Sequence, residues 1–228
     1  MKRLFVTLLF ILSCCFTLTY ASATSSDGPN IVLSDTGIFV PVDIIKQLQR
    51  DFPDAHTIRI TGWHTYSTPP QVDIVTRASY PQGHWVYDSY TKNTAQSNAT
   101  LKDLHIITCA TGVQKTLSAA FSQTYSSEVT LSASFQDSGY PVLGSASLGI
   151  ERSVSVQISQ TSIYSGPPAE LTDVNSREYR VRWYGNIGGW SGVIRHTVMG
   201  LTENVYGSWV EYVGAAEYYI DRYVNPTQ

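Results

Sequence analysis

The sequence predicts an all-β fold made of elongated antiparallel sheets, with one short helix and one long amphipathic hairpin rich in Ser and Thr. Two segments, 113–135 and 142–158, alternate apolar and polar residues with a period of two, which is the period of a strand. Only 14% of the residues are charged, and runs typical of helices are few. Stretches rich in Gly and Pro separate the remaining apolar runs, as in proteins made of strands and turns.

The first 23 residues are predicted to be a secretory signal peptide. Lys2 and Arg3 precede an apolar run over residues 4–16, and Ala21-Ser22-Ala23 matches a cleavage site. The mature chain would then begin at Thr24, and we expect a secreted, extracellular protein. An alternative is a lipoprotein signal cut before Cys14 or Cys15, but Leu12 fits that pattern awkwardly.

Charge and cysteine content exclude some classes of protein. Without Lys2 and Arg3, 13 of the 15 basic residues remain against 18 acidic ones, a net charge of −5. We therefore expect no binding to nucleic acid, which requires Lys and Arg to replace phosphate counterions. Cys109 would be the single cysteine of the mature chain, so no internal disulfide is expected.

Residues 24–104 are predicted to form an N-terminal, aromatic-rich lobe that binds a surface or receptor, with a boundary near residues 98–104. Its helix would span residues 44–50, with Asp43 as its cap and Pro53 ending it. Strands are expected at 57–60, 72–76 and 84–87. Aromatic rings stack on sugars or lie at lipid headgroups, so four side chains are candidates for surface or glycan binding: Trp63, Tyr66, Trp85 and Tyr87. Alternatively, these rings pack inside the fold.

Residues 105–228 are predicted to form an elongated β region that contains the hairpin 113–162. The two alternating segments have opposite parity, as an even-length turn at residues 137–140 requires. If Phe135 faces Val142, the same register places Leu131 opposite Ala146 and Phe121 opposite Val156. The apolar residues of both arms then share one face.

Charged residues divide this hairpin into a stem and a tip. Glu128, Glu151 and Arg152 mark the boundary, and each arm of the tip has about nine residues, close to the roughly 9–11 that cross a bilayer as a tilted strand. Lipid-facing side chains would be Val129, Leu131, Ala133, Phe135, Val142, Ala146, Leu148 and Ile150, and lumen-facing ones would be Thr130, Ser132, Ser134, Ser145 and Ser147. An ordinary sheet in a water-soluble protein, with its Ser/Thr face in solvent, explains the same pattern.

The Ser/Thr-rich strands 114–130 and 145–161 around this amphipathic tip resemble those of aerolysin-like β-pore-forming proteins. The resemblance covers about a quarter of the chain and is one of pattern. It implies a secreted protein that binds a target membrane lipid or glycan receptor, forms a homo-oligomer and inserts one hairpin per subunit into a shared barrel. The chain is shorter than larger family members, and its first part matches none of their receptor-binding domains.

Further strands are expected at 177–184, 192–198, 205–213 and 218–224, separated by residues 185–189 and Gly200. No enzyme activity, cofactor or metal site is expected. Val193 stands where a nucleophile elbow needs Gly, and the five histidines lack metal-ligand spacing. The alternative function is a secreted surface-binding module, an adhesin or carbohydrate binder, whose sheet never moves.

Overall fold

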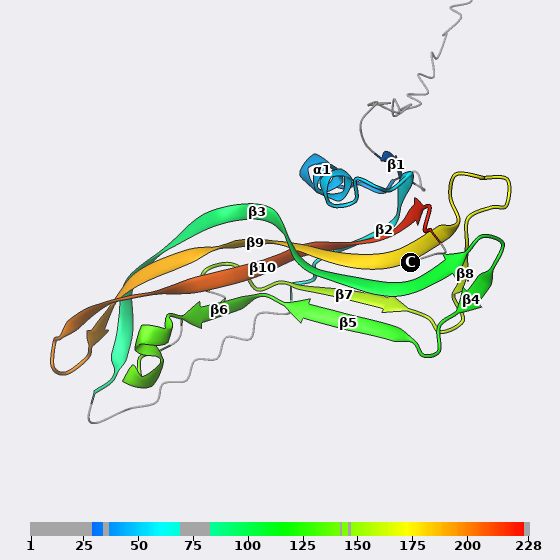
Figure 1. The fold of residues 1–228 in the computed structure, drawn as a ribbon. Coiled ribbons are helices and arrows are strands. Elements are labelled where there is room, and N and C mark those ends of the chain that lie inside the picture. Colours follow the sequence, from blue (N-terminus) through cyan, green and yellow to red (C-terminus); the bar gives the residue numbers. More distant parts are fainter. Residues whose placement is uncertain (1–28, 34–36, 69–82, 142, 146, 226–228) are drawn as a thin grey trace, which may run out of the picture.

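The computed structural model describes residues 29–33, 37–68, 83–141, 143–145 and 147–225. The described residues form a long, mostly β molecule with a single α-helix, so the predicted all-β class is confirmed (Figure 1). Strands β9 (Ser176–His196) and β10 (Thr202–Arg222) meet in a turn at one end of the molecule, and helix α1 (Val42–Asp51) lies over the other half. The predicted signal peptide and the strand at 72–76 lie outside the described residues.

One six-stranded sheet runs the length of the molecule. Its order is β1-β2-β10-β9-β3, and β6 also pairs with β10. The bounds are β1 (Asn30–Leu33), β2 (Thr57–Thr65), β3 (Trp85–Ala110), β6 (Glu128–Leu131), β9 (Ser176–His196) and β10 (Thr202–Arg222). Only β1 and β2 pair in parallel, and the other pairs in this sheet are antiparallel.

Two short antiparallel pairs form the stem of the predicted hairpin: β4 (Gln114–Thr116) with β8 (Ile163–Ser165), and β5 (Phe121–Ser126) with β7 (Ser153–Ile158). Phe121 lies opposite Ile158, whereas the sequence pattern placed it opposite Val156. A shift of two residues keeps every side chain on its predicted face, because side chains alternate with a period of two. Val154 and Val156 are accordingly buried against Trp183 of the main sheet.

Strands β9 and β10 are twice as long as predicted, because the glycines between the expected strands do not interrupt them. A Cβ on Gly188 would lie 2.0 Å from the Asn93 carbonyl oxygen and 2.7 Å from the Trp209 ring. The missing side chain therefore makes room for a neighbouring strand and a packed indole. The predicted break at 185–189 was wrong, since a glycine in a strand also serves close packing.

Strand β3 is a single element of 26 residues that includes the predicted boundary at 98–104. It pairs with β9 on both sides of that point, for example Thr94 with Gly188 and His105 with Arg180. The sheet is therefore continuous through the boundary, and the division into two lobes stays a prediction. The middle of β3 is polar and shows no alternation, which is why the sequence did not reveal it.

Helix α1 covers the sheet near β2, and its predicted position is confirmed. It begins after Pro41, and no side chain caps it, so the predicted capping role of Asp43 was wrong. Ile44 and Leu48 are fully buried against Ile58 and Ile220, which explains why an apolar stripe at helical spacing occurs here. In the part of the chain that the structure describes, no helix is long and apolar enough to cross a membrane.

Candidate functional site

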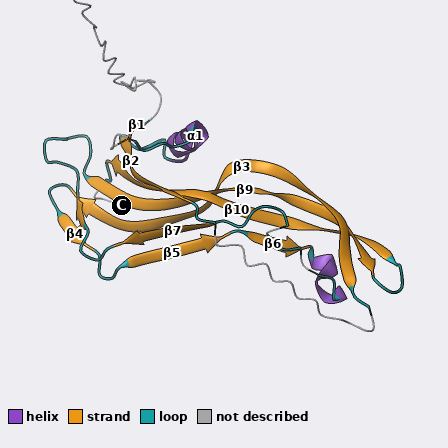
Figure 2. Cartoon of the chain, turned by 180° about the vertical axis from the view of Figure 1, so that it is seen from behind, coloured by secondary structure: helices purple, strands orange, loops and turns teal. Residues whose placement is uncertain are grey.

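The tip of the predicted hairpin does not form a hairpin in this structure. Residues 127–152, which we call the cover segment, connect β5 to β7, and their described part lies along the half of the main sheet that ends in the β9–β10 turn (Figure 2). Among the described residues, β6 pairs with β10 and not with the second arm of the predicted tip, and a 3-10 helix, η1 (Ala133–Ser138), follows β6. The alternation of apolar and polar residues correctly predicted a strand at 128–131, but it does not indicate which other strand this one pairs with.

The pairing of β6 with β10 depends on a tryptophan and a glycine. Trp190 Nε1 donates a hydrogen bond to the Thr130 carbonyl oxygen at 3.1 Å. A Cβ on Gly207 would lie 1.9 Å from that same oxygen and 2.6 Å from Trp190 Nε1, so any side chain there would displace β6. The hydroxyl oxygens of Thr130 and Ser208 are 2.7 Å apart across the same pair of strands.

Three of the eight side chains predicted to face lipid are buried in this structure. Leu131, Leu148 and Ile150 are at most 7% exposed, together with Leu143, which the pattern did not include. They pack on four residues of β9 and β10: Trp190, Ile194, Val205 and Trp209. Val129 and Phe135 are half-buried, Ala133 is exposed, and Val142 and Ala146 lie outside the described residues.

Aromatic contacts hold the end of the cover segment. The Phe135 ring meets Tyr206 edge-on at 5.1 Å between centroids, and Tyr140 meets Trp85 in the same way at 5.1 Å. Tyr87 Oη donates to the Pro141 carbonyl oxygen at 2.8 Å, and burial raises the pKa of this phenol. The turn predicted at 137–140 instead ends η1, where Gly139 has a φ of +67°.

The predicted boundary residues lie where the cover segment meets the stem. Arg152 Nη1 is 3.0 Å from Glu211 Oε1, and the Glu211 side chain is only 6% exposed. Asn186 Nδ2 donates to the other carboxylate oxygen at 3.0 Å, and the Arg152 guanidinium lies 4.0 Å over the Tyr66 ring. Glu128 is exposed and Glu151 half-buried. The ion pair ties the second arm of the cover segment to the middle of β10.

The predicted lumen-facing residues are partly used in turns. The hydroxyls of Ser132 and Ser134 are 3.2 Å apart, and the Ser145 carbonyl oxygen accepts the N–H groups of Leu148 and Ile150. Ser147 is exposed. These small side chains allow the segment to turn back on itself without burying a charge.

The four aromatic residues proposed for surface binding do not lie together. Trp63 packs on Tyr184 at 6.1 Å and fills the space over Gly214, so it belongs to the core beneath α1. Tyr66 contacts Arg152, whereas Trp85 and Tyr87 lie beside the cover segment. Their common role in this structure is packing, and three of them contact the cover segment directly.

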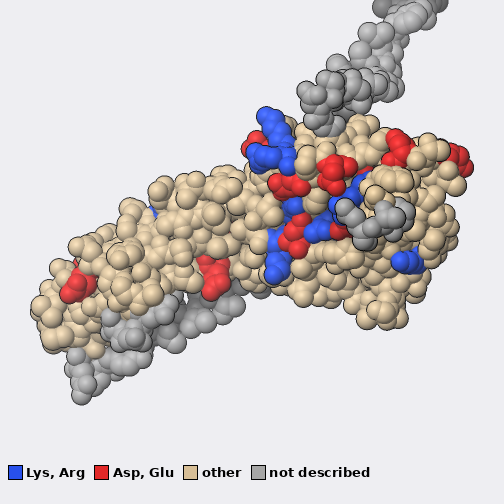
Figure 3. All heavy atoms as spheres, in the orientation of Figure 1, with Lys and Arg blue, Asp and Glu red and all other residues tan. Residues whose placement is uncertain are grey.

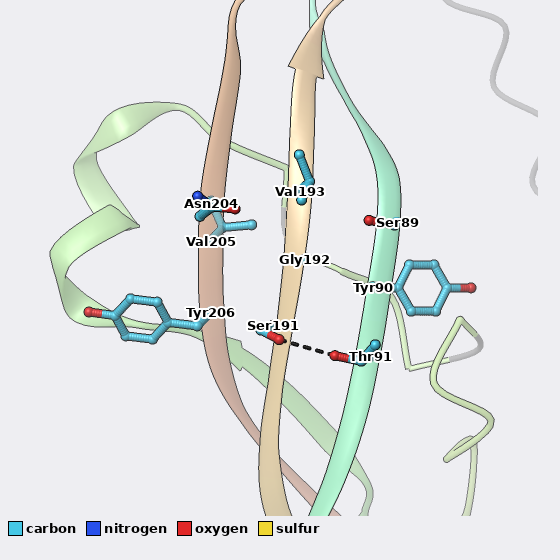
Figure 4. A pocket seen from close by; sticks show the side chains of 9 residues that line it. All are labelled: Ser89, Tyr90, Thr91, Ser191, Gly192, Val193, Asn204, Val205 and Tyr206. Atoms are coloured by element: carbon cyan, nitrogen blue, oxygen red, sulfur yellow. Dashed lines mark hydrogen bonds between the residues drawn. The ribbon is translucent and has the colours of Figure 1, made fainter.

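An open groove of about 280 Å³ lies across β3, β9 and β10, and sequence reasoning did not identify it (Figure 4). Gly192 leaves its floor bare, and the hydroxyls of Thr91 and Ser191 meet at 3.1 Å on one side. Tyr90 and Tyr206 extend outward from its two margins in Figure 4, away from one another. The residues come from three strands of ordinary polar composition, so no local sequence signal marks them.

Within the described ranges, no three His, Cys, Asp or Glu side chains are grouped to hold a metal ion. Cys109 is buried, and burial raises the pKa of its thiol.

No family model, curated protein or solved structure matches this chain.

Proposed function

We propose that this chain is a secreted β-pore-forming protein that binds a target membrane, forms a homo-oligomer and inserts the cover segment as a β-hairpin. One observation carries the proposal. The cover segment has the sequence of two amphipathic strands, yet it is folded against the main sheet. The strands that flank it in the sequence, β5 and β7, already pair with each other. The proposal agrees with the resemblance to aerolysin-like pore-forming proteins and requires neither a cofactor nor a catalytic residue.

The register of β5 and β7 supports this role for the cover segment. The pairing continues one step beyond the strands, because Ser127 N donates to the Arg152 carbonyl oxygen at 2.8 Å. If the same register continued further, apolar residues would face each other at three successive positions on one side: Val129 with Ile150, Leu131 with Leu148, and Ala133 with Ala146. Polar residues would face each other in the same way: Ser132 with Ser147 and Ser134 with Ser145. The extended hairpin would thus have one lipid face and one wet face.

The buried side chains explain why the cover segment would leave the main sheet only at a membrane. Fully burying a Leu or Ile side chain contributes roughly 1.5–3 kcal/mol, so moving Leu131, Leu148 and Ile150 into water would be strongly unfavourable. A bilayer offers them a second apolar environment, in which backbone groups must pair within the hairpins or between neighbouring subunits. One hairpin cannot satisfy that requirement alone, and this is the physical reason for a homo-oligomer.

A disulfide across β6 and β10 tests whether the cover segment has to move. Thr130 and Ser208 are register partners with exposed hydroxyls 2.7 Å apart, so Thr130→Cys with Ser208→Cys should form a bond that fixes the segment. We expect the oxidised variant to release no dye from liposomes or cells that the native protein permeabilises, and a reductant to restore release.

Thr124→Cys with Ser155→Cys is the matched control. These residues are also register partners with exposed hydroxyls, 2.8 Å apart, but they join β5 to β7, both outside the cover segment. Oxidation should leave its activity unchanged. Full release by the oxidised Thr130/Ser208 variant would refute insertion of the cover segment.

The second candidate is a surface-binding module with a static sheet, and the groove across β3, β9 and β10 favours it. Hydroxyl groups in an open groove with a volume of about 280 Å³ suit a small polar ligand such as one sugar unit. Retained glycan binding by the oxidised Thr130/Ser208 variant, together with intact vesicles for the native protein, would favour this module over the pore.

A further inference from the structure

The turn between β9 and β10 presents three large apolar side chains at the end of the molecule. Val198 is 69% exposed, Met199 60% and Leu201 55%. The segment from Thr197 to Thr202 contains no ionisable residue. Figure 1 places this turn at the end of the molecule opposite β4 and β8, where it projects beyond the rest of the sheet.

Hydrogen bonds to His196 fix the shape of this turn. His196 Nδ1 accepts the N–H groups of Val198 and Met199 at 3.4 and 3.1 Å, and its carbonyl oxygen accepts the Gly200 N–H at 3.0 Å. The ring itself is buried and meets Trp85 edge-on at 5.4 Å. The apolar side chains are therefore held outward by a buried anchor, so little conformational freedom would be lost on binding.

Shape and charge favour a lipid bilayer as the partner of this turn. A protruding turn offers no concave surface for a small ligand, whereas it can enter a soft interface. Charged residues flank the turn on both strands. Arg195 of β9 is paired with Asp88 at 3.2 Å, and Glu203 lies on β10. They would limit penetration to the turn itself, because charged groups in hydrocarbon are costly. Trp85 lies at the level of this boundary, where tryptophan is favoured in membranes.

We propose that the β9–β10 turn docks the protein end-on into the surface of a lipid bilayer, before the cover segment is released. The inference rests on the proposed function and specifies its first step. Helix η1 lies at the same end of the molecule as this turn (Figure 1). Docking through the turn would bring the cover segment close to the lipid that its buried side chains require.

Sedimentation with phosphatidylcholine vesicles tests the docking. The variant with Val198→Ser, Met199→Ser and Leu201→Ser should reduce vesicle binding about tenfold or more, because the three side chains carry most of the apolar contact. Binding should depend little on salt, since neither the turn nor this lipid is charged. A variant with Phe39→Ser and Ile163→Ser is the matched control: these side chains are 78% and 67% exposed, beside α1 and in β8.

An environment-sensitive dye on Met199→Cys should shift to the blue with vesicles, and the same dye on Ile163→Cys should not. No vesicle binding by the native protein, or equal binding by the triple Ser variant, would overturn the proposal. So would a triple variant that loses only self-association in lipid-free solution, which would make the turn a contact between copies.

These results separate docking from pore formation. If the native protein binds vesicles through the turn but releases no dye, the docking stands and the proposed pore fails. If the triple variant binds and releases dye like the native protein, the pore stands and the docking fails.

Discussion

Trp190 and Gly207 show how single residues determine the position of the cover segment. The indole N–H of Trp190 pairs with the backbone of β6, and the missing side chain of Gly207 allows the two strands to approach. Gly189, which directly precedes Trp190 on β9, would tolerate a Cβ, because that atom would lie 3.6 Å from the nearest carbonyl oxygen. Where β6 pairs with β10, glycine is therefore required at position 207 and not at position 189.

Ala133 distinguishes the folded cover segment from an inserted hairpin at the scale of one side chain. It is exposed in this structure, whereas the continued register would place it on the lipid face. We expect Ala133→Arg to leave folding and secretion intact and to abolish dye release, since a charge facing lipid costs about 2–4 kcal/mol per strand near mid-bilayer. Circular dichroism and liposome assays measure the two properties.

Ser134→Arg is the control for that substitution. Ser134 is equally exposed here, but it would face the wet side of the hairpin, so release should persist with altered ion selectivity. Equal loss of release in both variants would contradict the assigned faces. Leu131→Arg and Leu148→Arg are less informative, because both side chains are buried in the folded protein as well.

The strand elements show what alternation in a sequence predicts and what it leaves open. It predicted the faces of β5 and β7, whose apolar side chains pack on Trp183. It did not predict the register of β5 and β7, because a shift of two residues keeps the same faces. Nor did it predict the pairing of β6 with β10, which joins residues some 80 positions apart, or η1, whose Phe135 contacts Tyr206. The long β3 and the fused β9 escaped prediction because a polar exposed strand and a glycine-rich one carry no periodic signal.

The two arms of the cover segment would bring like charges together if they paired. In the continued register, Glu128 lies directly opposite Glu151, and like charges in such pairs are destabilising by roughly 0.2–1 kcal/mol. We expect Glu151→Gln to speed dye release about two- to fivefold, by removing this repulsion from the inserted hairpin.

Stopped-flow dye release at fixed protein and lipid concentration measures that rate. Glu170→Gln, at an exposed position between β8 and β9 and outside the cover segment, should release dye at the native rate. If Glu151→Gln is no faster than native, the two carboxylates do not meet before the step that limits release.

Charge is distributed unevenly over the whole molecule. On the face shown in Figure 3, acidic and basic side chains gather near α1, and the arm toward the β9–β10 turn has few. Arg182, 4% exposed, contacts Asp51 of α1 and Asp103 of β3, both at 2.5 Å. Buried ion pairs need both partners, so these contacts fix the helix to two strands. The arm is held together by apolar contacts instead.

Buried tyrosines should make the whole molecule sensitive to alkali. Burial, with smaller contributions from Glu217 and Tyr179, raises the pKa of Tyr164 from 10.0 to about 12. Burial also raises the pKa values of Tyr184 and Tyr218. The unfolded chain loses these protons first, so the free energy of unfolding should fall as pH rises from 10 through 12.

Urea unfolding between pH 8 and pH 12 measures this loss. Tyr164→Phe should lose less stability than the native protein over pH 10–12, because one phenol no longer contributes. Tyr90→Phe, at an exposed position, should follow the native curve. Identical curves for Tyr164→Phe and the native protein would contradict the assignment to Tyr164.

The irregular course of β3 bears on aggregation. This strand is the last in the order of the main sheet, and its pairing with β9 shifts register at five points along its length. At one irregular position, Asn98 has a φ of +52° and its carbonyl oxygen accepts a hydrogen bond from Gln47 of α1. A bulged, partly covered strand is a poor template for a second chain. Concentrated solutions of the protein should therefore resist fibril growth from this side of the sheet.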